Sequence, residues 1–145
     1  MENSEKEKQR WLDGIAAIGQ KTIFTPLGIK VIDVDDDQIV LTMPITDASR
    51  QALGLLHGGV SMVLAESAAS IHATWNIDLN EKIPVGIEIN GSHLSSASDG
   101  TVKAIGRVIR RSYKLIVHQI DIIHVESDTL LSTARVTNYY KSNGS

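Results

Sequence analysis

The sequence predicts an α+β fold in which an antiparallel sheet is wrapped around one long central helix. A segment dense in alanine and serine, residues 58–75, has the length and composition of that helix. Four strand-like segments follow it with only short breaks, and strands joined without intervening helices pair antiparallel. A shorter pair of strand-like segments precedes it. The length suits one domain, which we expect to span residues 1–145.

The segments before the long helix predict a terminal helix and a β-hairpin. Apolar residues recur near helical spacing over residues 1–19, and Gly19 is a stop signal. Branched residues dominate residues 27–34, and a second strand is expected at residues 38–43. Three aspartates at 35–37 form the turn between them. Adjacent carboxylates in a turn are usually solvated, so we do not interpret them as a metal site.

The segments around and after the long helix complete the prediction. Residues 46–56 are expected to form an irregular connection, and small or apolar side chains on nearly every helix face indicate that the helix is buried on most sides. The last residues, 141–145, are expected to form a flexible tail. The four later strands are expected at residues 82–94, 101–110, 115–125 and 130–139.

Composition excludes several classes of protein. The formal net charge of -3 and the pI of about 5.9 argue against a nucleic-acid partner, which usually requires a basic face. The absence of cysteine excludes disulfides, thiolate nucleophiles and zinc–thiolate sites. The polar N-terminus lacks the apolar core of a signal peptide, and no apolar run approaches the roughly 18 residues of a membrane span. We therefore expect a cytoplasmic protein without a membrane partner.

A His-Gly-Gly sequence opens the long helix. The first amides of a helix have no partner within it and the dipole there is positive, so Gly58 and Gly59 could hold a developing oxyanion beside His57. A tight turn into a helix would use the same glycines without any ligand. The residues alone leave these two interpretations open.

Glu66 is the carboxylate of the long helix. A buried carboxylate is costly unless it is paired or functional, so Glu66 is a candidate general base or nucleophile; the alternative is an exposed stripe. Ser70, one helical turn further on, could hydrogen-bond the carboxylate or a water, or only its own backbone. Gln51 could donate to a carbonyl or be an ordinary loop residue. No Gly-x-Ser-x-Gly elbow surrounds the helix serines, so a serine nucleophile has no support.

The remaining histidines and the basic residues give weaker indications. His93 ends a strand beside a Gly/Ser-rich segment, where a polar strand end is the favoured interpretation. The five histidines have no compact spacing of metal ligands, so no metal site is expected. Arg110, Arg111 and Lys114 flank a turn and could hold phosphates, but a charged hairpin is the favoured explanation.

One string changes the balance between these interpretations. LLHGGVSMVLAES resembles the HGG…E signature of hotdog-fold acyl-CoA thioesterases of the PaaI and Arthrobacter-type 4-hydroxybenzoyl-CoA thioesterase group, which includes enzymes that hydrolyse 1,4-dihydroxy-2-naphthoyl-CoA. EINGSHLSSA and YKLIVHQIDI resemble two further segments of the family, and the similarity runs from about Gly28 to Tyr139. The resemblance implies a hotdog fold and hydrolysis of an acyl-CoA, with no cofactor beyond the CoA of the substrate.

The resemblance also implies roles for the residues of this segment. Glu66 would act as nucleophile or general base, and Ser70 would position Glu66 or a water. The Gly58 amide would form the oxyanion hole, while Gln51 and His57 would orient the thioester carbonyl. In the family the site lies at a homodimer interface, with Glu66 and Ser70 from one subunit and the other three residues from its partner. A homotetramer of such dimers is expected.

CoA is expected to lie along a strand end, the helix and the basic turn. The contacts that the resemblance implies are Ser67, Gly86, His93, Leu94, Ser95, Ser96, Arg110, Arg111, Ser112, Tyr113 and Lys114. Relatives often carry an arginine in the stretch corresponding to residues 94–96 and another where Lys114 stands here. Both departures reduce bidentate recognition of phosphate.

Two alternatives lie outside thioester hydrolysis. A hotdog hydratase or dehydratase would need a histidine paired with an acid, but the dehydratase pattern HFPxxPxxPG is absent. A non-catalytic module that binds acyl-CoA has little reason to keep Glu66 beside an oxyanion-binding helix end. The acyl group stays open between small aromatic and short or medium-chain groups, because 4% aromatic residues indicate no aryl-specific pocket.

Overall fold

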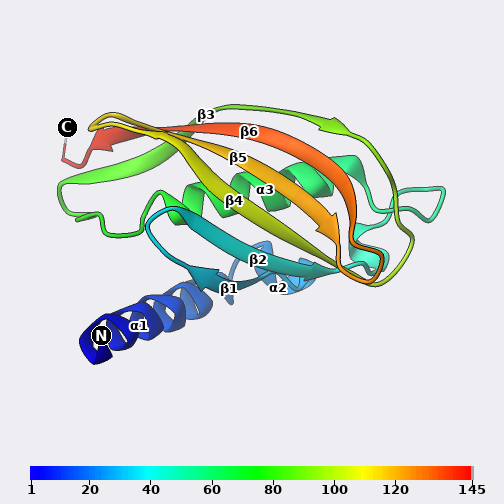
Figure 1. Cartoon of the computed structure of the whole chain (residues 1–145), viewed down its shortest axis with the longest axis horizontal. Coiled ribbons are helices and arrows are strands. Elements are labelled where there is room, and N and C mark those ends of the chain that lie inside the picture. Colours follow the sequence, from blue (N-terminus) through cyan, green and yellow to red (C-terminus); the bar gives the residue numbers. More distant parts are fainter. Residues whose placement is uncertain (145) are drawn as a thin grey trace.

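The structure is a computed structural model that describes residues 1–144 (Figure 1). The helices are α1 (Glu2–Gly19), α2 (Phe24–Leu27) and α3 (Gly58–His72), and Asp47–Ser49 form the 3-10 turn η1. The strands are β1 (Lys30–Val34), β2 (Gln38–Pro44), β3 (Lys82–His93), β4 (Thr101–Arg111), β5 (Leu115–His124) and β6 (Thr129–Ser142).

The six strands form one antiparallel sheet in the order β1-β2-β4-β5-β6-β3. The sheet curves around α3, which lies along its inner face (Figure 1). This confirms the predicted α+β hotdog arrangement and the hairpin of β1 and β2. β3 precedes β4 in the chain but pairs with β6, so β3 forms the far edge of the sheet. Within residues 1–144 no strand pairs with the outer side of β3.

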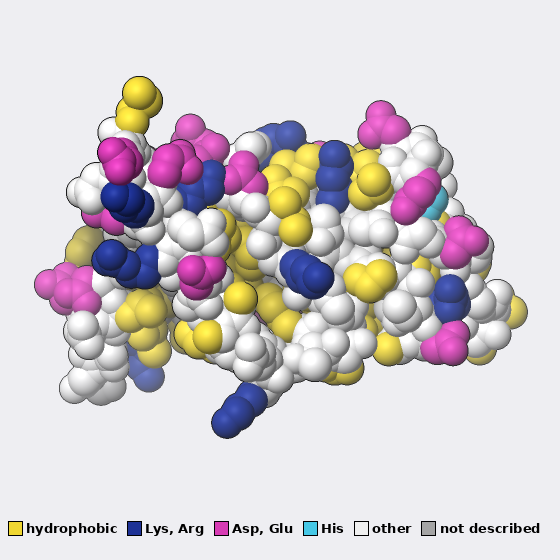
Figure 2. Space-filling view, turned by 90° about the horizontal axis from the view of Figure 1, so that it is seen from below, with side chains coloured by type: hydrophobic (Ala, Val, Ile, Leu, Met, Phe, Trp, Pro, Cys, Tyr) yellow, Lys and Arg dark blue, Asp and Glu magenta, His cyan; other side chains and the backbone are white. Residues whose placement is uncertain are grey.

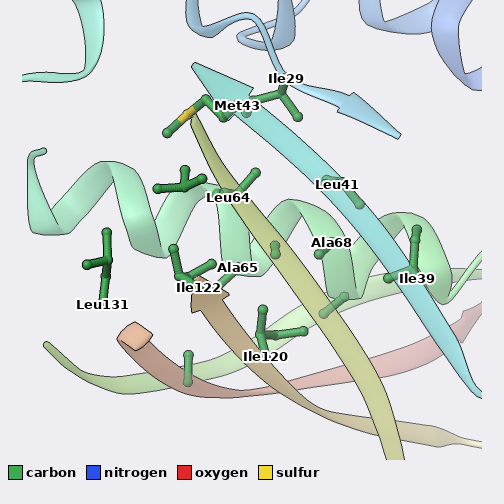
Figure 3. Close-up of a cluster of buried hydrophobic side chains, with 14 of the residues drawn as sticks. Ile29, Ile39, Leu41, Met43, Leu64, Ala65, Ala68, Ile120, Ile122 and Leu131 are labelled. Carbon is green, nitrogen blue, oxygen red and sulfur yellow. The ribbon is translucent and has the colours of Figure 1, made fainter. Parts of the chain in front are cut away.

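Small side chains on α3 allow the sheet to approach closely. Ala65, Ala68 and Ala69 are completely buried, and Leu64 fills the space next to them. The larger side chains come mainly from the sheet, and burial of each such side chain stabilises the fold by about 1.5–3 kcal/mol. Those that surround α3 include Ile39, Leu41, Met43, Ile120, Ile122 and Leu131 (Figure 3).

α1 is attached to the outside of the β1–β2 hairpin. Trp11 packs edge-on against Trp75 with ring centroids 5.2 Å apart, and Lys8 forms an ion pair with Asp33 of β1. The predicted aspartate turn also contacts Trp75, because Asp36 accepts a hydrogen bond from the Trp75 indole at 2.9 Å. Figure 2 shows acidic and basic side chains interspersed on the face that carries α1. No helix in the described part of the chain has the length and apolar character needed to cross a membrane.

Several element boundaries differ from the sequence prediction. The strand expected from residue 27 begins only at Lys30, because α2 occupies the preceding residues and ends at Gly28 with a left-handed φ of 70°. The long helix ends at His72 rather than at residue 75. The tail expected over 141–145 is wrong for its first two residues, because β6 continues to Ser142 and pairs there with the start of β3. Residue 145 lies outside the described residues.

Candidate active site

A cavity of about 200 Å³ opens where α3 begins and β3 ends. It brings together five residues that the sequence analysis selected: Gln51, Gly58, His93, Ser95 and Ser96. Sequence reasoning missed the remaining lining residues, which are Leu55, Leu56, Ser61, Leu131 and Ser132. The predicted neighbour Leu94 lies beside the cavity with an exposed side chain.

The start of α3 leaves one backbone amide for a ligand. His57 is the N-cap residue, and its ring Nδ1 accepts from the amide of Gly59 at 2.8 Å. The His57 carbonyl accepts from the amides of Val60 and Ser61 at 2.9 and 3.1 Å. Among the described residues, the amide of Gly58 has no such acceptor. It lies at the positive end of the helix dipole and can therefore hold a developing negative oxygen.

His57 and Gln51 each keep a side-chain donor. Because His57 Nδ1 accepts a backbone proton, the neutral ring carries its own proton on Nε2. The Gln51 carbonyl oxygen accepts from the amide of Leu53, which leaves the Nε2 group of Gln51 as the donor. Both side chains can thus donate to a carbonyl oxygen held near Gly58.

His93 lies directly against the helix start. A Cβ built on Gly58 would be 2.6 Å from His93 Nε2, so the ring needs a glycine at this position. His93 Nδ1 lies 2.7 Å from Ser132 Oγ on β6, and this hydrogen bond orients the ring. The interpretation of His93 as no more than a polar strand end is therefore incomplete, since its imidazole forms part of the cavity wall.

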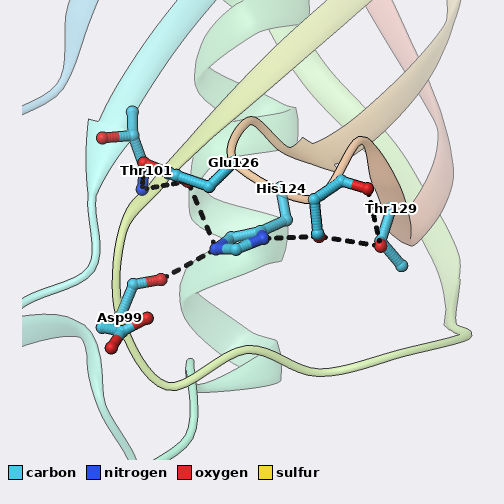
Figure 4. Close-up of polar contacts among 6 residues, drawn as sticks. Asp99, Thr101, His124, Glu126 and Thr129 are labelled. Carbon is cyan, nitrogen blue, oxygen red and sulfur yellow. Dashed lines mark hydrogen bonds and ion pairs between the residues drawn. The ribbon is translucent and has the colours of Figure 1, made fainter.

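The loop after β3, residues 94–100, is anchored by polar contacts at its far end (Figure 4). His124 Nε2 lies 2.9 Å from the Asp99 carbonyl, which can only accept, so Nε2 carries the ring proton. The Glu126 carboxylate accepts from the Thr101 amide at 2.9 Å, and this bond holds the pKa of Glu126 below its usual value. The cavity wall that this loop supplies is thus fixed by the β4 and β5 ends.

Glu66 lies on the exposed side of α3, so the expectation that it is buried is wrong for the single chain. Its carboxylate lies against β3, where a Cβ built on Gly86 would be 2.9 Å from Glu66 Oε1. At about 1.5 Å per residue, the helix from Gly58 to Glu66 rises by about 12 Å. The carboxylate and the Gly58 amide of one chain are therefore too far apart to act on the same carbonyl group.

Ser67 and Ser70 lie beside and one turn beyond Glu66. Ser70 Oγ donates to Asn138 Oδ1 of β6 at 3.2 Å, and Ser67 is half-buried on α3. Sequence reasoning did not single out Asn138. The available signal was its position in β6, where alternate residues face the core and an amide stands among apolar side chains.

The basic turn lies at the other end of β3. It joins β4 to β5 and packs beside the first residue of β3, because Lys82 Nζ donates to the Tyr113 carbonyl at 3.0 Å. Lys82 Nζ also lies 4.3 Å from the centre of the Tyr113 ring. β3 then runs for roughly 35 Å before it reaches the cavity at His93. Within one chain, the basic turn and the cavity are therefore separated by the length of β3.

Some polar residues of the turn form hydrogen bonds within the protein, whereas others extend into solvent. Arg111 Nη2 donates to the Asp36 carbonyl at 2.7 Å, which ties the turn to the β1–β2 hairpin. The Ser112 hydroxyl accepts from a backbone amide within the turn at 3.1 Å. The side chains of Arg110 and Lys114 are exposed. Arg110 and Lys114 are therefore the cations of this turn that a phosphate could reach most easily.

Comparison with known proteins defines the class of this chain. The Thioesterase superfamily profile matches residues 53–131, so the chain belongs to the thioesterase superfamily and is a hotdog-fold thioester hydrolase. It is 34% identical over 126 residues to 1,4-dihydroxy-2-naphthoyl-CoA hydrolase of Escherichia coli, covering 87% of this chain and 91% of that protein. The family predicted from the HGG…E string is confirmed.

Two solved structures show the same fold with substantial identity. A point variant of thioesterase PA1618 from Pseudomonas aeruginosa has a TM-score of 0.86 and 30% identity, covering 90% of this chain and 94% of that chain. A point variant of thioesterase SAV0944 from Staphylococcus aureus has a TM-score of 0.79 and 33% identity, covering 82% of this chain and 98% of that chain.

Proposed function

We propose that this protein hydrolyses acyl-CoA thioesters at a site shared between two subunits. The observation that carries the proposal is the distance along α3 between the oxyanion-binding amide of Gly58 and the carboxylate of Glu66. The Gly58 amide is left without an acceptor at the helix start, whereas Glu66 lies about 12 Å further along the helix. A Glu66 carboxylate from one subunit and a Gly58 amide from its partner would supply both halves.

The β3 edge supports pairing of subunits. It is a long edge strand that exposes Val85 and Ile87, and such an edge is a template for pairing with another chain. Two β3 edges paired antiparallel about a two-fold axis would place the start of each strand beside the end of its partner. The basic turn at Lys82 would then approach the partner's cavity, which reunites the predicted CoA contacts. Further association into a homotetramer is part of the proposal.

The chemistry of the step follows from the residues. Glu66 either attacks the thioester carbonyl carbon directly or removes a proton from a water that attacks it. The carbonyl oxygen becomes negative and is held by the Gly58 amide, with donors from Gln51 and His57 nearby. The carbon–sulfur bond then breaks, and the CoA sulfur leaves and takes up a proton. Where Glu66 is the nucleophile, a water next hydrolyses the acyl anhydride on Glu66, which releases the free acid and restores the carboxylate. A thioester is already activated toward nucleophiles, so the step needs no metal or cofactor.

The relatives support both the residues and the substrate class. The Staphylococcus aureus protein was crystallised once with a glutamine and once with a glutamate replaced by alanine, and that glutamine precedes that glutamate by fifteen residues. Gln51 precedes Glu66 by the same interval. The Escherichia coli relative is a hydrolase of an aromatic acyl-CoA. We therefore propose an acyl-CoA with a small aromatic or a short or medium-chain acyl group.

Replacement of Glu66 tests this function. The variant Glu66→Gln should fold and bind acyl-CoA but lose about 10²–10⁴-fold in kcat, the usual contribution of an acid–base group. Release of CoA thiol can be followed with a thiol reagent over a panel of aryl, short and long acyl-CoAs, because the protein has no cysteine of its own. Glu7→Gln, which changes an exposed carboxylate on α1 at the opposite edge of the sheet from β3, is the matched control. Equal turnover of wild type and Glu66→Gln would remove Glu66 from the mechanism.

A further inference from the structure

We propose that Asn138 is a positioning residue that fixes the direction of the Ser70 hydroxyl beside Glu66. The inference rests on the proposed thioester hydrolysis. It adds to the mechanism a residue that does not contact the substrate directly. It concerns the middle of α3, where the helix faces the junction of β3 and β6.

The three side chains converge on one point of the sheet. Asn138 pairs with Gly86 across the β3–β6 ladder, and its side chain is completely buried. A Cβ built on Gly86 would lie 2.9 Å from Glu66 Oε1 and 3.8 Å from Asn138 Oδ1. Asn138 also accepts the hydroxyl proton of Ser70 at 3.2 Å. The glycine thus leaves room for a carboxylate and an amide to approach the same space.

The hydrogen bond from Ser70 decides what this serine can do. A serine hydroxyl has one proton, and Asn138 takes it, so the remaining lone pairs of Ser70 Oγ can only accept. An attacking water has two protons. It can give one to Glu66 and direct the other toward Ser70 Oγ, which leaves an oxygen lone pair for the thioester carbon. Asn138 therefore makes Ser70 an acceptor for water, and neither residue loses a proton in the step.

The amide group of Asn138 has a cost to stability. Its Nδ2 is buried and has no hydrogen-bond partner among the described residues. A buried donor without a partner destabilises a fold, and an apolar side chain of the same shape would avoid this. A polar group in such a place, facing the same glycine as the Glu66 carboxylate, indicates a functional use of its other polar atom, Oδ1.

The test is a double-mutant cycle on the whole protein. Asn138→Leu is close to the same shape and should lower kcat about tenfold, the loss expected from one positioning hydrogen bond, while KM stays unchanged. Ser70→Ala should have a similar effect, and the double variant should be no slower than either single variant, because Asn138 acts through Ser70. The melting temperature of Asn138→Leu should equal or exceed that of wild type. Thr137→Val, the neighbouring position on β6, is the control and should keep full activity.

The outcomes separate this inference from the proposed function. Full kcat in Asn138→Leu, or multiplicative losses in the double variant, would overturn the role of Asn138 while Glu66→Gln remains inactive. A fall in kcat that only parallels a fall in melting temperature would assign Asn138 to structure alone and overturn the inference as well. If Glu66→Gln is also fully active, the proposed hydrolysis itself fails.

Discussion

In two buried histidines, His72 and His118, the hydrogen bonds determine which ring nitrogen carries the proton. His72 Nε2 lies 2.7 Å from the Asp35 carbonyl, which can only accept, so the His72 proton is on Nε2. His72 Nδ1 then accepts from His118 Nε2 at 2.7 Å. His118 Nδ1 remains without a proton, is buried, and has no partner among the described residues. Both rings are therefore neutral in the folded protein.

This pair predicts a loss of stability in mild acid. Burial lowers the pKa of His118 to about 3, with His72 and Arg111 adding to the shift, and burial also lowers the pKa of His72. Below pH 6.5 the unfolded chain binds protons that the folded chain does not. The free energy of unfolding should therefore fall as the pH decreases, by about 1.4 kcal/mol per pH unit for each such histidine until its folded-state pKa is reached.

Urea unfolding between pH 7 and pH 5 measures this effect. The variant His118→Leu should be less stable than wild type at pH 7, because His72 Nδ1 loses its donor. Its stability should nevertheless depend less steeply on pH, by about one proton. Carboxylates elsewhere contribute equally to both proteins and cancel in the comparison. Parallel slopes for the two proteins would show that His118 is not held neutral by the fold.

At the scale of residues, the local sequence pattern identified the candidate catalytic residues, but it did not predict their burial or their contacts with other elements. Gly58 and Glu66 stand out because glycines and a lone acid are unusual at these points of an otherwise small and apolar helix. The exposure of Glu66 could not be predicted, because it depends on which face of α3 the distant strand β3 covers. Asn138 and Ser132 were missed for the same reason, since their partners lie on other elements.

At the scale of elements, the site depends on how closely α3 approaches the β3 edge. Two glycines of β3 make this approach possible: Gly86 lies against Glu66, and Gly91 lies against Met62. The register of β3 also shifts between Gly86 and Glu88, and such bulges often occur next to active sites, where they redirect a strand. The packing of α3 on β3 therefore sets the position of the carboxylate.

A methyl group at Gly86 should disturb catalysis more than folding. In Gly86→Ala the new Cβ would lie 2.9 Å from Glu66 Oε1, so the flexible carboxylate must move. We expect kcat to fall by about 10²-fold, as displacements of about 1 Å at a reacting group can do. Steady-state kinetics and circular dichroism measure the two effects.

Gly14→Ala is the matched control for this substitution. A Cβ at Gly14 of α1 meets no atom within 4 Å, and alanine favours a helix by about 0.5–1 kcal/mol, so this variant should be fully active and at least as stable. A Gly86→Ala protein as active as Gly14→Ala would show that the Glu66 position is not critical.

The elements and their order along the chain were predicted well, whereas the order of the strands within the sheet was not. Alternation of apolar residues and the turn residues between segments locate the strands in the chain. The placement of β3 beside β6 depends on long-range pairing, about which local periodicity carries no information. The short helix α2 was missed because four residues around Pro26 have no measurable periodicity.

At the scale of the whole molecule, one chain contains every proposed group but no complete site. The cavity and the basic turn lie at opposite ends of β3, and Glu66 lies away from the Gly58 amide of its own chain. Two-fold pairing of β3 edges is the simplest arrangement that joins them. In solution we therefore expect a mass at least twice the 15.8 kDa of one chain.

Subunit complementation tests the shared site most directly. Gln51→Ala and Glu66→Gln should each be nearly inactive, because every site in either protein lacks one group. When the two variants are co-expressed in equal amounts, about a quarter of the sites should combine an intact Gln51 from one subunit with an intact Glu66 from its partner. Thiol release should then recover to about a quarter of the wild-type rate. A mixture that stays as inactive as the two separate variants would show that Gln51 and Glu66 serve the substrate from the same chain.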